Sequence, residues 1–276
     1  MIDVPILFYT HVEQKEVFIM IVSPGEAEAT IDALTQVLKN KTRKDPLAVR
    51  KQRLEDAVVQ IKLHRRNRVL ASHGLLLTSN GLVLTVYHSI KKQEQRLKST
   101  AQQQPQDASQ LEQWLSTSVQ PKQYVVDQEH QRYAIDPTFW YTHPAFDLTI
   151  IKAVMPRTPE PIGWCYDSDK LPYGTIMERH SLDDEGNMQK KTGKMKESKT
   201  ADFNDNWILD SFLRTIPSEP GSSGSPISVD GRLVGIGAYS SGKDHYGGAK
   251  VKYALPLIKA VRDDLKDMLR QAKKGL

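Results

Sequence analysis

Apolar positions along this chain fall mainly into short runs of the length of β-strands, separated by turn residues. Two runs, 74–78 and 81–88, flank the turn signal Ser79-Asn80-Gly81 and predict a hairpin. Further apolar runs at 57–61 and 148–151 predict more strands. The pattern therefore predicts a mostly β core.

Helical spacing occurs near both ends. After two predicted strands, 6–9 and 17–22, residues 26–38 carry apolar positions on one helix face. A second helix is predicted at about 256–272, beginning near Pro256. The first of these forms a small β-β-α element without an assigned role.

Two polar segments separate these elements. The basic stretch 39–53 is compatible with a linker helix. Residues 91–120, rich in Gln and Ser, are predicted to form an exposed loop with partial helix.

Composition indicates an ordinary globular chain, with 39% hydrophobic and 26% charged residues. No apolar run approaches the ~20 residues that span a bilayer, and the N-terminus does not resemble a secretory signal. Cys165 is the only cysteine, so an intramolecular disulfide is excluded. We expect a cytoplasmic protein without membrane contact, in which Cys165 is a buried structural thiol rather than a nucleophile.

The formal charge of +5 raises a nucleic-acid hypothesis. The basic residues are scattered, however, and the densest runs, 64–68 and 190–199, are expected to be solvated strand ends or loops. Neither a phosphate-binding loop nor an RNA-binding signature accompanies them. The histidines lack partners at metal-ligand spacing. We therefore expect no nucleic acid, metal or cofactor.

Chemistry is concentrated in the hexapeptide Gly221-Ser222-Ser223-Gly224-Ser225-Pro226. A serine hydroxyl is a weak nucleophile that needs a base and fixed donors for the developing oxyanion. Glycines around Ser223 allow a sharp backbone turn, so that the amides of Gly221 and Ser223 can point at one oxygen. A glycine-serine turn between two strands is the alternative for this peptide considered alone.

Two further residues fit the same chemistry. His88 ends an apolar strand, and Asp147 directly precedes another, where a carboxylate can be buried yet bonded to an imidazole. The order His88, Asp147, Ser223 is the order found on chymotrypsin-type double barrels. Asp136 is a fallback acid, but no apolar strand follows it.

On these residues the chain resembles trypsin-like peptidases, and within them the HtrA (Deg) type. The resemblance covers about residues 57–272, and no PDZ module follows. The matching segments are Ala57–Ile61, Gly74–His88, Phe146–Lys152, Asp167–Leu171, Gly221–Pro226, Val229–Ile236 and, as the final strand, Tyr253–Pro256.

The resemblance implies two six-stranded antiparallel β-barrels, at about 57–155 and 160–255, with a C-terminal helix and residues 1–56 as a small α/β extension. It implies a serine endopeptidase acting on polypeptide substrates. Ser223 would be the nucleophile, His88 the base and Asp147 the orienting acid, with the Gly221 and Ser223 amides as the oxyanion hole. Ser222 stands where enzymes activated by N-terminal cleavage keep an aspartate, so activation by that ion pair is not expected.

The resemblance also assigns the primary specificity pocket. Without an acid at its base, a preference for Lys or Arg is disfavoured and small or medium apolar side chains are expected, although Asp244 could reverse this. A catalytically silent peptide-binding or scaffold protein and a nonproteolytic acyl hydrolase are the alternatives, and the oligomeric state is open. The pocket residues would be Pro217, Ser218, Gly237, Ala238, Tyr239 and Ser240.

Overall fold

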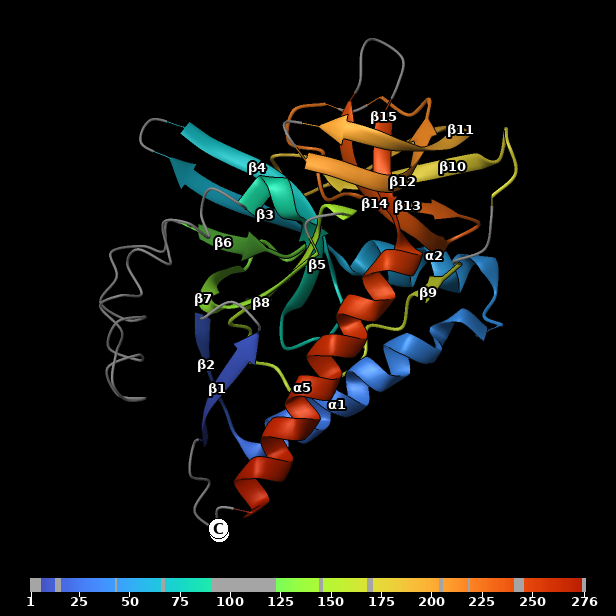
Figure 1. Ribbon diagram of the computed structural model, residues 1–276. Coiled ribbons are helices and arrows are strands. Elements are labelled where there is room, and N and C mark those ends of the chain that lie inside the picture. The colour runs from blue at the N-terminus through green and yellow to red at the C-terminus, as the bar shows by residue number, and fades with distance from the viewer. Residues whose placement is uncertain are drawn as a thin grey trace.

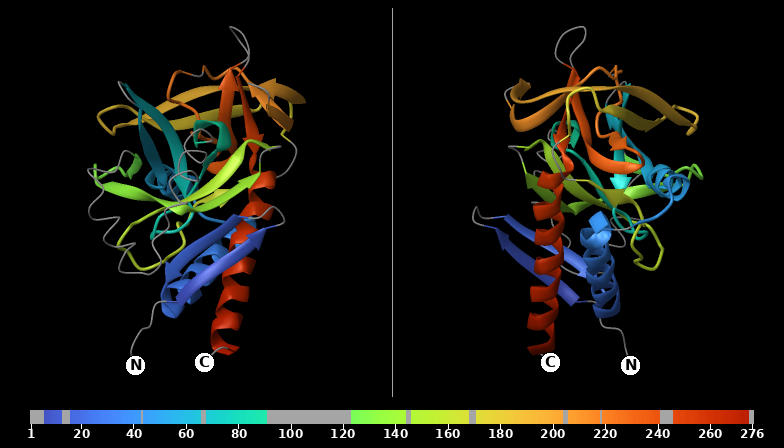
Figure 2. Two further views of the ribbon diagram at one scale, coloured as in Figure 1. Left: turned by 60° about the vertical axis from the view of Figure 1, so that its left-hand side comes forward. Right: turned by 90° about the vertical axis from the view of Figure 1, so that its right-hand side faces the viewer.

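The computed structural model describes residues 6–12, 16–42, 44–65, 68–90, 123–143, 146–167, 171–203, 206–217, 219–240 and 246–274. The insertion 91–120, Ser218 and Asp244 lie outside the described residues, and Tyr239 and Ser240 are described by their backbone only. Figures 1 and 2 show two β units, with the helices α1 and α5 running side by side beneath them.

Six antiparallel strands close the first barrel in the order β3-β4-β5-β8-β7-β6. Apolar residues make up most of the central strands β5 and β8, whose residues are buried at almost every position. The strands are β3 (Val58–Arg65), β4 (Arg68–Leu76), β5 (Leu82–Val86), β6 (Gln123–Val126), β7 (Arg132–His143) and β8 (Leu148–Ala153).

The second sheet also closes, because β13 pairs with both β10 and β14. The ring β13-β10-β11-β12-β15-β14 is antiparallel, and the short β9 adds to β14 in parallel. The predicted pair of six-stranded barrels is thus confirmed. The strands are β9 (Cys165–Tyr166), β10 (Ile176–Leu182), β11 (Met188–Phe203), β12 (Asn206–Arg214), β13 (Pro226–Val229), β14 (Arg232–Ser240) and β15 (Tyr246–Lys250).

The final strand was placed wrongly by the sequence pattern. The strand is β15, whereas residues 251–253 form a 3₁₀ turn and α5 (Ala254–Lys274) begins immediately afterwards. Gly247 and Gly248 weaken the sequence signal of β15, since glycine is depleted in strands. Pro256 is compatible with the helix because it lies in the first turn, where no intrahelical donor is needed.

The segment before the barrels contains β1 (Ile6–Val12), β2 (Glu16–Val22), α1 (Pro24–Lys39), a 3₁₀ turn (Asn40–Thr42) and α2 (Leu47–Asp56). Ser23 caps α1 by accepting a hydrogen bond from the Glu26 amide at 3.1 Å, and Pro24 follows as the first helical residue. The hairpin β1–β2 lies against β7 and α5, while α1 packs on α5.

Polar contacts join this segment to the barrels. Asn40 Nδ2 donates to the Trp164 carbonyl at 2.9 Å, and the Tyr166 hydroxyl donates to the Leu38 carbonyl at 2.8 Å. Both contacts are made with the connection between the two barrels. Residues 24–56 are therefore part of the packed structure.

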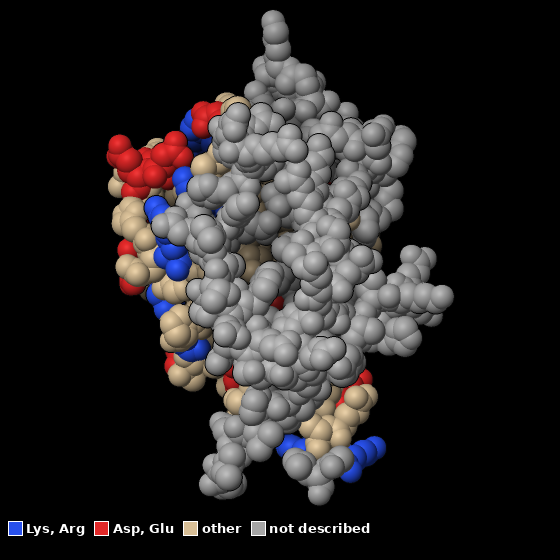
Figure 3. Space-filling view, turned by 90° about the vertical axis from the view of Figure 1, so that its left-hand side faces the viewer, with Lys and Arg blue, Asp and Glu red and all other residues tan. Residues whose placement is uncertain are grey.

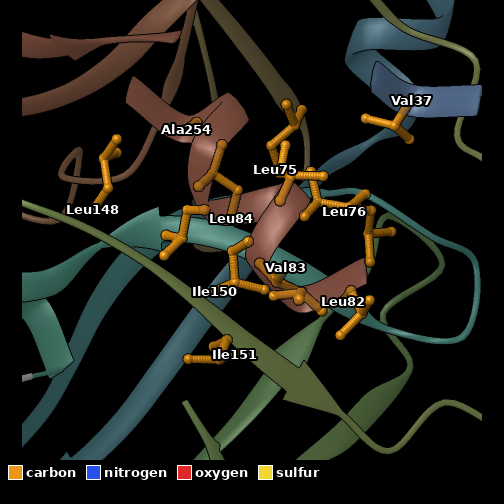
Figure 4. Packing of buried hydrophobic residues seen from close by; sticks show 14 of the residues in the cluster. Val37, Leu75, Leu76, Leu82, Val83, Leu84, Leu148, Ile150, Ile151 and Ala254 are labelled. Carbon is orange, nitrogen blue, oxygen red and sulfur yellow. The ribbon is translucent and has the colours of Figure 1, made fainter. Parts of the chain in front are cut away.

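The main core extends from the first barrel into the helices. Val37 of α1 and Ala254 of α5 belong to the same cluster as the central residues of β4, β5 and β8 (Figure 4). The apolar cluster inside the second barrel is much smaller, and two fully buried arginines, Arg179 and Arg214, lie in the same part of the molecule. The members of that cluster are Met177, Met195, Ile216, Ile227 and Val234.

Candidate active site

His88, Asp147 and Ser223 meet between the two barrels. Asp147 Oδ2 lies 2.6 Å from His88 Nδ1, and its Oδ1 accepts a hydrogen bond from the His88 backbone amide at 2.8 Å. His88 Nε2 lies 3.2 Å from Ser223 Oγ. The carboxylate thus fixes the ring so that Nδ1 carries a proton and Nε2 faces the hydroxyl.

Local backbone geometry places each of these side chains. His88 lies two residues after β5, in the helical turn 87–90, and Asp147 directly precedes β8, which pairs with β5. Asp147 is 1% exposed and has a left-handed φ of 52°, a conformation that aspartate tolerates better than most residues. This turn aims the carboxylate back at His88.

Ser223 lies in the serine loop, which we define as residues 219–226. The loop opens with a β-turn in which the Ser222 amide donates to the Glu219 carbonyl at 2.9 Å. Pro220 occupies its second position, and Gly221 has a φ of 90°, which makes it a type II turn. The Glu219 amide in turn donates to Ser222 Oγ at 3.1 Å, so the Ser222 hydroxyl closes the turn from the other side.

This turn fixes the direction of the Gly221 N–H. Type I and type II turns differ by a flip of the central peptide, here Pro220–Gly221. Within the described residues, the amides of Gly221 and Ser223 donate to no acceptor, whereas those of Ser222, Gly224 and Ser225 are all bonded. Two adjacent donors therefore remain for an external oxygen, as an oxyanion hole requires.

Both barrels hold the serine loop. The His73 amide of β4 donates to the Ser223 carbonyl at 2.7 Å, and the Gly224 amide donates to the Gly237 carbonyl of β14 at 2.7 Å. Gly224 has a φ of 84°, and a Cβ there would lie 1.8 Å from the His73 carbonyl oxygen. Only glycine fits where the loop passes β4.

The described part of the expected specificity pocket borders the serine. The Ala238 carbonyl lies 3.3 Å from Ser223 Oγ, and Pro217 is exposed before the loop. Gly237 makes room for a neighbour, since a Cβ there would lie 2.9 Å from Nη2 of the buried Arg214. Arg214 Nη1 also donates to the Ile216 carbonyl at 2.8 Å.

Two buried basic residues behind the serine loop were not singled out by the sequence. His73 was expected to have an ordinary surface or structural role, and Arg179 carried no prediction. Each lies within a strand beside other polar residues, and this local sequence gives no sign of its partner. Burial lowers the pKa of both side chains, and in Arg179 the neighbouring Glu219 opposes that shift.

No metal-binding group of three or more His, Cys, Asp or Glu side chains occurs in the described part of the chain. Among the described residues, no helix is long and apolar enough to cross a membrane. On the face in Figure 3, Lys and Arg alternate with Asp and Glu along the coloured flank.

Comparison with known proteins finds a likeness in the fold alone. No family model matches the sequence, and no curated protein matches it. Three solved structures illustrate the likeness. Deg5 is 15% identical, with a TM-score of 0.52, covering 76% of this chain and 90% of its own. The active form of the Rv3671c protease from M. tuberculosis is 17% identical, with a TM-score of 0.53 and coverages of 78% and 87%.

The third is the HtrA-type protease AlgW, crystallised with a decapeptide. It is 12% identical, with a TM-score of 0.53, covering 79% of this chain and 68% of its own. At such low identity the likeness establishes architecture. The chain has the chymotrypsin-like double-barrel fold of HtrA-type and related trypsin-like protease domains.

Proposed function

We propose that this protein is a serine endopeptidase that hydrolyses peptide bonds of polypeptide substrates through an acyl-enzyme. The observation that carries the proposal is the continuous line of contacts from Asp147 through His88 to Ser223, at 2.6 and 3.2 Å. The second distance is at the upper end of hydrogen-bond reach, which is common before substrate binds.

Each residue has a defined role in this reaction. Ser223 Oγ attacks the peptide carbonyl while His88 Nε2 takes its proton and then delivers it to the leaving amine. Asp147 holds the tautomer and stabilises the imidazolium. The amides of Gly221 and Ser223, which donate to no acceptor among the described residues, receive the carbonyl oxygen as it becomes negative. Water then repeats the same steps on the acyl-enzyme.

The test is digestion of an unfolded protein such as casein, followed by mass spectrometry of the products. Ser223→Ala should abolish cleavage. Ser225→Ala is a matched control in the same loop, because Ser225 is fully buried and its hydroxyl has no partner among the described residues. Asp147→Asn should retain the fold and lose activity by about 10⁴-fold.

A fluorophosphonate probe separates the two main outcomes. Labelling of wild type but not of Ser223→Ala would support an activated nucleophile, and the residues before each cut bond would define the pocket. If wild type neither cleaves casein nor reacts with the probe, the proposal fails and a catalytically silent peptide-binding protein becomes the better reading.

A further inference from the structure

His73 contacts the serine loop with its side chain as well as its backbone. The residue lies on β4 of the first barrel and is 4% exposed. Its Nδ1 is 2.8 Å from the carbonyl oxygen of Gly221. Gly221 is also the residue whose N–H we assign to the oxyanion hole. The His73 backbone amide donates a hydrogen bond to the carbonyl of Ser223, which is the other residue of the oxyanion hole.

The partners of the ring determine its protonation. The Gly221 carbonyl can only accept, so Nδ1 must carry a proton. On the other side, Nε2 lies 2.9 Å from both the backbone nitrogen and the carbonyl oxygen of Leu182, and in the neutral ring it accepts the Leu182 N–H. Burial lowers the pKa of His73 and outweighs the contacts with the Leu182 and Gly221 backbone, which raise it, so the neutral form is favoured. The ring thus bridges β10 and the serine loop with both nitrogens satisfied.

The opposite barrel supports the start of the same segment. Arg179 of β10 is 1% exposed and donates from Nη1 to the Pro217 carbonyl. Its Nη2 lies 3.7 Å from Glu219 Oε2, at the first residue of the type II turn. Arg179 therefore holds the Pro217 carbonyl, and His73 holds the Gly221 carbonyl.

We propose that His73 is a positioning residue that holds the Gly221 carbonyl through its Nδ1–H and so keeps the Gly221 and Ser223 amides aimed at one oxygen. This inference rests on the proposed function. The ring touches neither substrate nor Ser223 Oγ and acts only through the backbone of the loop. The peptide that carries the Gly221 carbonyl also carries the Ser222 N–H, which closes the type II turn on the Glu219 carbonyl. Losing the bond from His73 frees this peptide and loosens the turn, so the Gly221 N–H is no longer held in one direction. The oxyanion hole weakens while the contacts among His88, Asp147 and Ser223 persist.

Two substitutions separate this role from simple packing. His73→Asn places an amide donor near the position of Nδ1 and keeps the bond to Gly221 while losing that to Leu182. His73→Gln reaches the position of Nε2, keeping Leu182 and losing Gly221. Each variant gives up one buried hydrogen bond, so their losses of stability should be similar.

The readout is kcat and KM on a casein-derived peptide, with the melting temperature of each variant. We expect His73→Asn to keep kcat within about threefold of wild type, and His73→Gln to lose about 10- to 100-fold in kcat with little change in KM. Equal losses in both variants, or a fully active His73→Gln, would overturn the proposal.

A second measurement does not depend on the variants folding. In ¹⁵N spectra of histidine-labelled wild type, His73 should show the neutral Nδ1–H tautomer at pH 7. An Nε2–H tautomer would remove the donor to Gly221 and overturn the inference even for an active enzyme. If wild type is inactive and unlabelled by the fluorophosphonate, the proposed function itself has failed, and the positioning role of His73 in catalysis fails with it.

Discussion

Replacing Gly221 by alanine tests the link between turn type and catalysis. A Cβ at this position would lie 3.5 Å from the Ala71 carbonyl oxygen and 3.6 Å from Ala71 Cβ, which are ordinary contacts. Space is therefore available. The substitution acts through φ, because 90° is a conformation that only glycine adopts freely.

The size of the effect follows from that strain. Holding alanine in a left-handed conformation costs about 1–2 kcal/mol, whereas a type I turn accommodates it without strain. A penalty of about 1–2 kcal/mol shifts the balance between the two turns about 5- to 30-fold towards type I. The flipped peptide removes the Gly221 N–H from the oxyanion hole. If the two turns are of comparable energy in wild type, kcat should fall by up to about 5- to 30-fold, short of the 10²- to 10³-fold that complete loss of one donor costs.

The assay is steady-state cleavage of one peptide by wild type, Gly221→Ala and Gly174→Ala. Gly174 is a matched control, since it has a φ of 81° with open space around it and its turn is closed by the Thr175 amide and the Pro172 carbonyl at 3.2 Å. The control should keep the kcat of wild type. A Gly221→Ala enzyme with unchanged kcat would refute the assignment of the Gly221 amide to the oxyanion hole.

Three further predictions concern stability. Gly224→Ala forces a Cβ within 1.8 Å of the His73 carbonyl oxygen, so we expect a loss above about 4 kcal/mol; soluble protein with the melting temperature of wild type would contradict this. Burial lowers the pKa of His180 from 6.5 to about 4, so the unfolded chain binds this proton first as pH falls. The free energy of unfolding should then drop by up to about 3 kcal/mol between pH 6.5 and 4, and urea titrations should show a shallower dependence in His180→Gln. Asn80→Ala removes hydrogen bonds of 3.2 Å to Glu26 and Thr30 of α1, so the free energy of unfolding in urea should fall by about 1–3 kcal/mol. An unchanged free energy of unfolding would show that α1 docks without these two bonds.

The meeting of His88, Asp147 and Ser223 could be predicted because each lies beside a strong local signal. His88 ends an apolar strand, Asp147 begins one, and the glycines around Ser223 mark a tight loop. In a double barrel these signals fix where each side chain stands. The strand order of the first barrel then brings β5 and β8 together as partners.

The supporting contacts could not be predicted, because they join residues far apart without any local pattern. His73 reaches Gly221 across 148 positions, and nothing in the sequence of β4 indicates that partner. The docking of residues 24–56 depends on the same kind of contact, as between Asn40 and Trp164. β15 was missed because its two glycines give no local strand signal. The strand forms through its pairing with β12 and β14.

The pairing of α1 with α5 has a consequence for how the protein is made. The two helices share one core with the first barrel, yet 215 positions separate the end of α1 at Lys39 from the start of α5 at Ala254 (254 − 39 = 215). Contacts over such a separation form late, because a long loop must close before they yield any stability. While α5 is still being synthesised, Leu34 and Val37 of α1 have no partner helix to cover them. Until α5 has been made, the side of α1 that packs on α5 is uncovered, and such transiently exposed apolar surface makes an intermediate prone to aggregate.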